Sequence, residues 1–348
     1  MKAYQRQNWG HFQGQVVERL TFETDKGYRL SVMTYGATIL EYASPDIQGK
    51  IDNIVLAWET FEDYIGNEPR FGAAIGPVAG RIAGASFELD GQTYSLLANN
   101  GVNHLHSDPA GFDSSLFSIK DISDHHVSLV LDRQDGSGGY PGHLQVQIDY
   151  HLEESGQFSI HYQIKTDKKT LVNPTNHSYF NLSGNPHQAI DKIQLEIKAK
   201  GFYPLDQTSL PLGILDHQAP FFKAIQEGTT FGKVFASQDP QIIMHKGLDH
   251  PFLLTKGLNQ ASFYDPESCR QLTVWTDRPV LVIYTANYPD PERKIAGQSM
   301  KAHTGFALET QALPDAIHQG QENSVILEAG QTFFSQTTYF AGVAEEKS

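Results

Sequence analysis

Alternation of apolar and polar residues with a period of two dominates this chain, which is the pattern of half-buried β-strands. Apolar residues occupy every second position of HLQVQIDYHL (143–152) and again of FSIHYQI (158–164). The short polar segment between these two runs predicts a hairpin turn. A second hairpin is predicted over 85–97, where Asp90-Gly91 stands at the turn, because Asp-Gly favours tight primed turns.

Strand patterns recur along the whole chain, whereas helical patterns are few and short. Only 60–65 and 221–227 predict short helices, and no helical apolar stripe is sustained over 12 residues. We therefore predict an all-β fold, a large antiparallel β-sandwich with few short helices. Without a linker, repeat or low-complexity tract, one domain over 1–348 is expected. Further strands are expected at 31–41, 53–58, 126–132, 192–198, 272–276, 280–285, 303–310 and 331–340.

The charge and cysteine content narrow the classes of partner. The net charge is −14, from 40 acidic against 26 basic residues, and such a surface repels a phosphate backbone, so nucleic acid is not expected as a partner. One cysteine, Cys269, cannot form an internal disulfide, which fits a reducing compartment. No apolar run is long enough to span a bilayer, and no secretory signal is visible, so we expect a cytoplasmic protein with no membrane partner. The sequence leaves the oligomeric state open.

The segment GVNHLHSDPAGFDS (101–114) carries the first candidate chemistry. His104 and His106 are two apart, so both would point to one face of an extended strand. Such a pair could chelate a metal, but a third ligand and preferably a carboxylate would also be needed. A hydrogen-bonded loop is the commoner situation for such a pair, and we predict no metal site. Asn103, beside them, is a candidate for hydrogen bonding to a ligand.

Two further segments are polar on one face of a predicted strand. In NPTNHSYFNL (173–182), His177 and Tyr179 stand among amide side chains, and such groups converge where a polyhydroxyl ligand must be satisfied. In HTGFALETQ (303–311), Glu309 and Gln311 share a face with the small residues at 305 and 307. A carboxylate beside open space and near histidines has the geometry of a general base, although a solvated strand glutamate is the commoner situation.

Asp249 and Arg81 complete the set of candidates. Asp249 interrupts an apolar run in HKGLDHPFLL (245–254), where it either caps a turn or accepts hydrogen bonds from hydroxyl groups. Arg81 stands among small residues in RFGAAIGPVAGRIAGASF (70–87) and could reach a pocket as a donor fork. The glycines of this segment do not form G-x-G-x-x-G and lead into a hairpin, so they do not indicate a dinucleotide site.

Taken together, these segments resemble the aldose 1-epimerase (galactose mutarotase) family over nearly the whole chain. The matching segments, in order, are YGATILEY, FGAAIGPVAGRIAG, NHLHSD with GFDSSLF, DGSGGYPG, NPTNHSYFNL, GLDHPF, YTAN and GFALETQALPDA. The resemblance implies a galactose mutarotase-like supersandwich with a cleft across one sheet. One departure stands out: Ser107 and Asp108 follow His106 where the family usually has two glycines.

The resemblance also implies roles for individual residues. Glu309 matches the family's general base, His177 its general acid, and His106 its second active-site histidine near the ring oxygen. Asp249 and Arg81 match contacts to sugar hydroxyls, and we place Asn103, Tyr179 and Gln311 beside them as substrate-binding residues.

The implied activity is the interconversion of α and β anomers of aldoses such as galactose and glucose. This reaction moves only protons, so no cofactor is expected, and a small-molecule sugar is the expected partner. We expect the Glu309–His177 pair to start as carboxylate and imidazolium. A glycoside hydrolase, with Asp249 as second carboxylate, and a non-catalytic sugar-binding protein are the alternatives. A phosphosugar epimerase would need more basic residues at the pocket than Arg81.

Overall fold

The longest strands are apolar on one face and polar on the other, and they associate into one large sheet. The computed structural model describes residues 2–66 and 68–344, and within them this sheet has nine antiparallel strands. In order across the sheet, the strands are β11 (Ser118–Ser123), β12 (His126–Arg133), β13 (Leu144–Leu152), β14 (Gln157–Thr166), β29 (Thr332–Val343), β23 (Arg270–Thr276), β22 (Ala261–Tyr264), β18 (Gln194–Ile197) and β20 (Thr229–Thr230).

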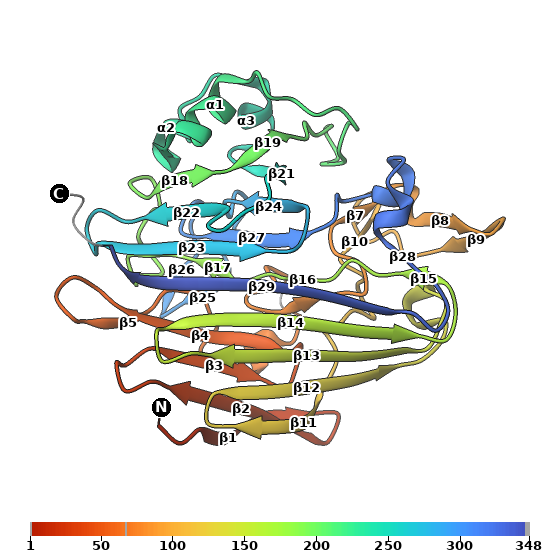
Figure 1. The fold of residues 1–348 in the computed structure, drawn as a ribbon, viewed down its shortest axis with the longest axis horizontal. Helices are drawn as coiled ribbons and strands as arrows, with labels where there is room; N and C mark the ends of the chain where they lie inside the picture. Colours follow the sequence, from red (N-terminus) through yellow and green to blue (C-terminus); the bar gives the residue numbers. More distant parts are fainter. Residues whose placement is uncertain (1, 67, 345–348) are drawn as a thin grey trace.

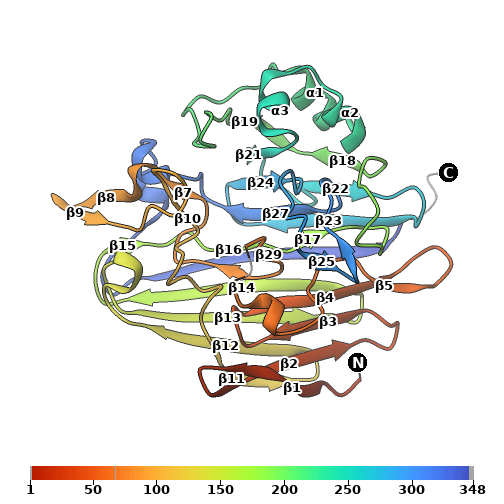
Figure 2. The same cartoon turned by 180° about the vertical axis from the view of Figure 1, so that it is seen from behind.

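Two five-stranded sheets pack against the inner face of the large sheet (Figures 1 and 2). The first is an N-terminal meander of β1 (Gln5–Phe12), β2 (Gln15–Glu23), β3 (Arg29–Met33), β4 (Thr38–Pro45) and β5 (Ile51–Asn53). The second has the order β17 (Tyr179–Phe180), β27 (Phe306–Gln311), β24 (Val280–Tyr284), β21 (Asp249–Leu254) and β19 (Ala199–Phe202).

Short elements connect and cover the sheets. Three short α-helices lie together at one end, beyond β18 and β19 (Figure 1): α1 (Pro220–Glu227), α2 (Phe231–Phe235) and α3 (Pro240–His245). Two-stranded pairs are formed by β7 (Arg81–Ile82) with β10 (His104–Leu105), β6 (Ala74–Ile75) with β16 (Thr175–Asn176), β8 (Ser86–Leu89) with β9 (Gln92–Ser95), β15 (Thr170–Leu171) with β28 (Ile326–Leu327), and β25 (Lys294–Ile295) with β26 (Gln298–Ser299).

One continuous core fills the space between the sheets. Leu129 of β12 and Ile148 of β13 pack in the same cluster as Val32 of β3 and Leu308 of β27, and all four side chains are at most 1% exposed. The period-two alternation therefore places apolar side chains inward from both layers, as aligned sheet packing requires. The predicted all-β sandwich with few short helices is confirmed.

The predicted hairpins and the longer helix are confirmed. Strands β13 and β14 pair antiparallel from Leu144 opposite Thr166 onward, and β8 pairs with β9 around Asp90-Gly91, both at positive φ. Helix α1 begins at Pro220, which lacks the amide hydrogen that a first helical turn leaves unpaired. The other predicted helix, 60–65, is reduced to one 3₁₀ turn over Glu62–Tyr64.

Two of the predicted strands are wrong in extent. The segment 31–41 contains parts of β3 and β4, which pair with each other across a turn in which Gly36 and Ala37 have positive φ. The sequence does not reveal this turn, because both strands beside it are largely buried and lack a clear alternation. The segment 53–58 continues β5 only to Asn53 and then forms an isolated bridge from Val55 to Phe180.

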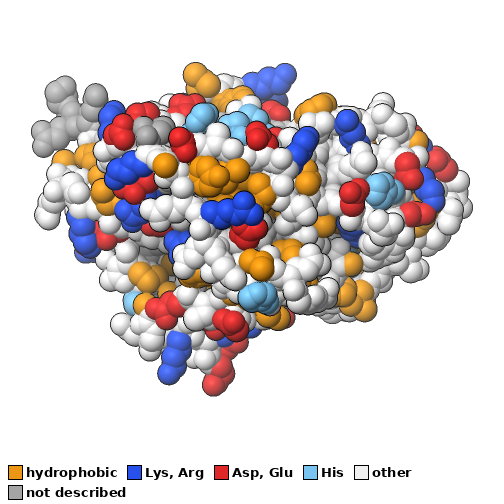
Figure 3. All heavy atoms as spheres, turned by 90° about the horizontal axis from the view of Figure 1, so that it is seen from below, with side chains coloured by type: hydrophobic (Ala, Val, Ile, Leu, Met, Phe, Trp, Pro, Cys, Tyr) orange, Lys and Arg blue, Asp and Glu red, His pale blue; other side chains and the backbone are white. Residues whose placement is uncertain are grey.

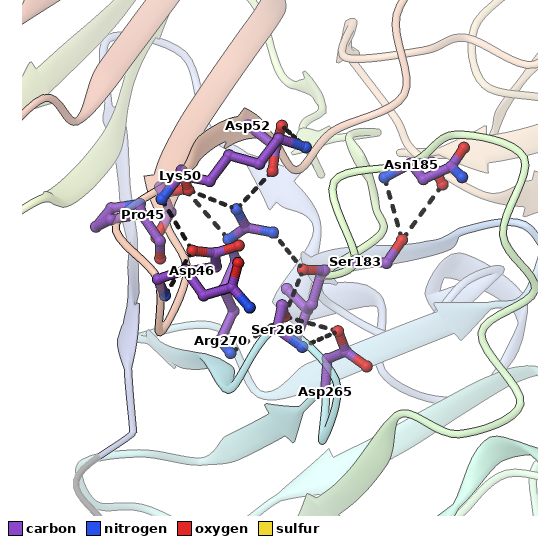
Figure 4. A network of polar contacts seen from close by, with 12 residues as sticks. Pro45, Asp46, Lys50, Asp52, Ser183, Asn185, Asp265, Ser268 and Arg270 are labelled. Carbon is purple, nitrogen blue, oxygen red and sulfur yellow. Dashed lines mark hydrogen bonds and ion pairs between the residues drawn. The ribbon is translucent and has the colours of Figure 1, made fainter.

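A fully buried arginine joins the large sheet to the N-terminal sheet (Figure 4). Arg270, at the start of β23, donates from Nε to the Ser44 carbonyl at 3.2 Å and from Nη1 to the Leu182 carbonyl at 3.0 Å. Its Nη2 donates to the Lys50 carbonyl at 3.0 Å and to Asp52 Oδ2 at 2.9 Å. Each nitrogen of the guanidinium therefore has an acceptor, which is the condition for burying such a charge.

We expect the Arg270→Met variant to lose about 3 kcal/mol or more of unfolding free energy, because Asp52 and three backbone carbonyls each lose a hydrogen bond from a charged donor. Guanidinium denaturation measures the change. The control is Arg6→Met, which removes an exposed ion pair with Glu18 and should cost under about 1 kcal/mol. Equal losses in the two variants would contradict the role assigned to Arg270.

One face of the molecule is mixed in charge. On the face seen in Figure 3, which lies next to β1, β2 and β11 in Figure 1, acidic and basic side chains are interspersed. No helix among the described residues is both long enough and apolar enough to cross a bilayer.

Candidate active site

Strand β27 divides its side chains between the core and a cleft. Phe306 and Leu308 point into the core, whereas Glu309 and Gln311 line the cleft. The two faces predicted from alternation are therefore correct within β27. His303 precedes the strand and lies apart from this face, with its ring stacked on Phe235 at 4.0 Å between centroids.

The cleft has a volume of about 300 Å³ and crosses the outer face of the sheet that contains β27. Strands β17, β27, β24 and β21 form its floor, and loops form its walls. Seven of the eight predicted site residues line it. Its charged and polar lining includes Arg70, Arg81, His106, His177, Tyr179, Asp249, Glu309 and Gln311.

His177 and Glu309 meet at the floor of the cleft. Nε2 of His177 lies 3.4 Å from Oε1 of Glu309, and each side chain is 6% exposed. The backbone of His177 is fixed by hydrogen bonds to Ala73 and Gly72 at 2.9 and 3.1 Å, and its ring lies 5.0 Å from that of Tyr179. The pair is close enough for proton transfer with little movement.

His106 enters the cleft from the turn that follows β10. Its ring lies 5.4 Å from the His177 ring, nearly perpendicular to it at 84°. The residue has φ +57°, in the left-handed region that side chains other than glycine seldom adopt. The backbone of Gly80 fixes this turn, because the His106 amide donates to the Gly80 carbonyl at 3.0 Å.

The prediction that His104 and His106 share a face is wrong. Strand β10 ends at Leu105, and the left-handed conformation of His106 breaks the alternation. The His104 ring instead bonds to the Leu97 carbonyl at 2.7 Å and lies against Tyr140. His104 therefore supports the loop and does not reach the cleft.

Arg81 and Asp249 lie next to each other at the wall of the cleft. Arg81 Nη1 lies 3.9 Å from Asp249 Oδ2, and Arg81 Nε donates to Asn100 Oδ1 at 2.9 Å. Their side chains are 20% and 18% exposed, so both can be reached from the cleft. Such a partly open donor and acceptor suit the hydroxyl groups of a bound ligand.

Asn103, in contrast, is not among the residues that line the cleft. It is 2% exposed, accepts from the Gly84 amide at 3.1 Å and donates to Thr208 Oγ1 at 3.2 Å. It thus connects two loops, and its position favours a supporting role over contact with a ligand. Nearness to His106 in the sequence did not predict contact with the cleft, because the chain turns at His106.

Arg70 is a functional candidate that the sequence did not reveal. Its Nε lies 3.4 Å from Asp113 Oδ2, both side chains are 12% exposed, and Arg70 lines the cleft. A second carboxylate, Asp108 Oδ2, lies 4.0 Å from Arg70 Nη2. Arg70 begins the glycine-rich segment that drew attention to Arg81, but nothing in the sequence indicates that it meets Asp113.

Hydrogen bonds stabilise Ser107, one of the two residues that stand where the family resemblance led us to expect glycine. Ser107 also has a positive φ, of +61°, and its buried hydroxyl bonds to the Val78 amide and carbonyl and to the Tyr140 hydroxyl. These bonds offset the conformational cost that glycine would avoid. Neither Ser107 nor Asp108 is among the residues that line the cleft. Asp108 is close to a lining residue, Arg70.

Burial shifts the pKa values of the three side chains at the floor of the cleft so that the neutral form of each is favoured. Burial, aided by Asp249, raises the pKa of Glu309 to about 8, although Arg81 and Arg70 oppose the shift. Burial and the charge of Arg70 lower the pKa of His177 to about 3. The same two causes hold the pKa of His106 well below its ordinary value.

The expectation of an ionised Glu309 facing a protonated His177 is therefore wrong for the free protein. At neutral pH the pair holds one proton, and that proton resides on Glu309. Burial is the largest cause of both shifts, and it disfavours the charged form of each side chain. Residue types indicate the attraction between the two side chains but not their degree of burial.

The same three side chains have the composition of a metal-ligand set. One ring nitrogen each of His106 and His177 and one oxygen of Glu309 lie within 4.8 Å of one another. Both histidines would have to present a bare nitrogen to an ion. The hydrogen bond that the Gly80 amide donates to Nδ1 of His106 at 3.2 Å opposes that arrangement, and we assign no metal to the site.

Comparison with known proteins identifies the family of the chain. A family model described as aldose 1-epimerase matches residues 18–339. Galactose mutarotase from Bos taurus is 35% identical over 332 residues, covering 93% of each chain. Aldose 1-epimerase from Escherichia coli K12 is 31% identical over 332 residues, covering 94% of this chain and 95% of its own.

The fold comparison agrees as well. The crystal structure of galactose 1-epimerase from Lactobacillus acidophilus NCFM superimposes with a TM-score of 0.86 at 25% identity, covering 97% of this chain and 98% of that chain. The expected mutarotase-like sandwich and the resemblance noted in the sequence are thereby confirmed. By sequence and by fold, the chain belongs to the aldose 1-epimerase family.

Proposed function

We propose that the cleft opens and recloses the ring of an aldose such as galactose or glucose, which interconverts its α and β anomers. The observation that carries this proposal is the buried contact of 3.4 Å between His177 Nε2 and Glu309 Oε1. It provides a proton donor and a proton acceptor at one point of a cleft of about 300 Å³. Membership of the aldose 1-epimerase family implies a sugar substrate.

The reaction needs two proton transfers and nothing else. Glu309, as carboxylate, takes the proton of the anomeric hydroxyl, while His177, as imidazolium, delivers a proton to the ring oxygen. The bond between the anomeric carbon and the ring oxygen breaks, and a free aldehyde forms. After rotation about the adjacent carbon–carbon bond, attack on the other aldehyde face reverses both transfers. Each positioned acid or base contributes roughly 10²–10⁴-fold.

The protonation state of the free protein is the same as the state that follows ring opening in this cycle. Ring opening leaves the proton on Glu309 and none on Nε2 of His177, which is the state that burial favours in the free protein. The carboxylate–imidazolium state differs from it by one transfer across 3.4 Å. The pair must therefore hold one proton in total, and such a shared proton titrates as a property of the pair.

We expect kcat/KM to stay level at neutral pH and to fall on the alkaline side near pH 8. Above the Glu309 pKa of about 8 the pair loses its last proton, and only near the His177 pKa of about 3 does it take up a second. The profile is measured by polarimetry of anomer exchange across the pH range.

Asp113 is a second carboxyl near the cleft whose titration could affect the pH profile. Burial raises its pKa to about 6, and it lies next to Arg70, so replacing it provides a control. The Asp113→Asn variant should keep the alkaline limb where the parent has it. If kcat/KM of the parent protein fell at about pH 6.5, the ordinary pKa of histidine, the assignment of the alkaline limb to Glu309 would be wrong.

Arg81 and Asp249 are proposed to bind sugar hydroxyls, with Tyr179 and Gln311 beside them. Arg81 is a donor and Asp249 an acceptor, separated by 3.9 Å at the cleft wall. Gln311 Nε2 donates to Glu309 Oε2 at 3.2 Å, so it also orients the carboxyl. Comparing exchange rates for glucose, galactose, xylose and maltose would establish which aldose these contacts select.

We expect the Arg70→Gln variant to move the alkaline limb of kcat/KM upward by about one pH unit, because a nearby cation favours the carboxylate of Glu309. The profile of the purified variant is compared with that of the parent. Arg19→Gln, which breaks an ion pair with Glu41 in the N-terminal sheet, is the matched control and should leave the limb in place. An unmoved limb in Arg70→Gln would show that Arg70 does not act on Glu309.

A further inference from the structure

The two histidines of the cleft have different hydrogen-bond partners, and this difference separates their roles. We propose that the backbone amide of Gly80 locks His106 as a neutral imidazole with its proton on Nε2, so that His106 donates a hydrogen bond to the substrate but does not transfer a proton. Gly80 is then a positioning residue for His106. The tautomer rests on geometry alone, whereas the identity of the substrate rests on the proposed function.

A pair of backbone contacts holds His106 against Gly80. Strands β7 and β10 pair through Arg81 and Leu105, and the next residues outward are Gly80 and His106. The His106 amide donates to the Gly80 carbonyl at 3.0 Å, and the Gly80 amide donates to Nδ1 of His106 at 3.2 Å. Both backbone and ring of His106 are thus fixed by one residue.

Gly80 itself has little freedom to move. It has φ +76°, a conformation typical of glycine, and a Cβ at this position would lie 2.9 Å from Cβ of Pro314. The close approach of Pro314 on one side and the two hydrogen bonds on the other fix the direction of the Gly80 amide. The donor aimed at Nδ1 is therefore part of a rigid frame.

A backbone amide can only donate, so Nδ1 of His106 must carry a lone pair. A neutral imidazole then has its single proton on Nε2. A second proton on Nδ1 would face the Gly80 amide hydrogen across 3.2 Å and leave that amide without its acceptor. His106 is 7% exposed, so water cannot readily replace the lost partner.

The charged groups around His106 act in the same direction. The positive charges of Arg70 and Arg81 disfavour a second proton on its ring, and His177 and His104 would add to this effect only if they were protonated. Glu309 lies within the same 4.8 Å cluster but is paired with His177. The surroundings therefore favour the neutral ring that the hydrogen bond requires.

His177 has no such restraint. In the described part of the chain its Nδ1 has no hydrogen-bond partner, and its Nε2 faces the Glu309 carboxyl at 3.4 Å. No amide hydrogen opposes a second proton on this ring, and a carboxylate at that distance stabilises it. Of the two histidines, His177 can therefore become the imidazolium that ring opening consumes, and His106 cannot.

The test uses the whole protein labelled with ¹⁵N in its histidines, in the absence of sugar. Long-range ¹H–¹⁵N correlation spectra report which ring nitrogen is protonated, and the signals missing from His106→Gln assign His106. We expect His106 to keep a bare Nδ1 and a protonated Nε2 from about pH 5 to about pH 9. A proton on Nδ1, or uptake of a second proton in that range, would overturn the proposal.

Matched glutamine variants provide the second readout, because the glutamine amide can donate near the Nε2 position but cannot transfer a proton. We expect His106→Gln to retain anomer exchange within about tenfold of the parent, the effect of weakening one hydrogen bond. His177→Gln should be slower by roughly 10²–10⁴-fold. Equal, severe losses in two folded variants would overturn the division of roles.

Failure of the proposed function would look different. In that case the parent protein would not accelerate anomer exchange at all, while the ¹⁵N spectra would still report the tautomer of His106. The two claims are therefore tested by separate measurements on the same sample.

Discussion

The Glu309→Gln variant will lose nearly all catalysed anomer exchange, by roughly 10³-fold or more, because an amide cannot accept the proton of the anomeric hydroxyl. The substitution is nearly isosteric, so the fold should be preserved. The new amide oxygen can still accept from Gln311 Nε2, which now lies 3.2 Å from Glu309 Oε2. The new amide nitrogen can donate to His177 Nε2, which lies 3.4 Å from Oε1.

Sugar binding should survive in this variant, since Arg81 and Asp249 remain in place. Polarimetry measures exchange, and titration followed by NMR or calorimetry measures binding. The control is Glu41→Gln, a side chain only 13% exposed that is paired with Arg19 and Arg29 outside the cleft, which should exchange anomers like the parent. Parent-like exchange by Glu309→Gln would remove Glu309 from the role of base.

The His177→Asn variant will be the second most impaired, with a loss of roughly 10²–10⁴-fold in kcat. Asparagine cannot reach the Nε2 position beside Glu309 and cannot transfer a proton to the ring oxygen. The Glu309 carboxyl also loses the neighbour that shares its proton at 3.4 Å. Polarimetry on the purified variant gives the rate, with far-ultraviolet circular dichroism to confirm the fold.

His161→Asn is the matched control, because this histidine is half-buried on the outer side of the large sheet, away from the cleft. Its ring forms a hydrogen bond with the Ser159 hydroxyl. It should retain the rate of the parent. Near-normal turnover by His177→Asn would transfer the acid role to His106, and the tautomer proposed for His106 would then also be wrong.

The sequence predicted best what depends on local alternation. The two faces of β27 follow from a period of two, so the pattern of residues alone was enough to assign Glu309 and Gln311 to one side of a strand. The resemblance of the ordered segments then identified the family. Alternation failed where the backbone leaves the extended region, at the turn around Gly36 and at His106.

What the sequence could not provide depends on contacts between distant segments. The ion pair of Arg70 with Asp113 and the hydrogen bond from Gly80 to His106 join residues 43 and 26 positions apart. The protonation of Glu309 and His177 depends on burial, which raises one pKa to about 8 and lowers the other to about 3. Residue types alone suggested an ion pair, and three-dimensional packing reverses that state.

The central claim is that this cleft catalyses exchange between sugar anomers, and exchange NMR tests it most directly. With galactose at anomeric equilibrium, saturating one anomeric proton should attenuate the signal of the other once the protein is added, with no new species formed. Glu309→Gln at the same concentration should leave the second signal unchanged. Binding of sugar by the parent protein without transfer of saturation would contradict catalysis. The release of new reducing ends from an oligosaccharide would indicate a hydrolase instead.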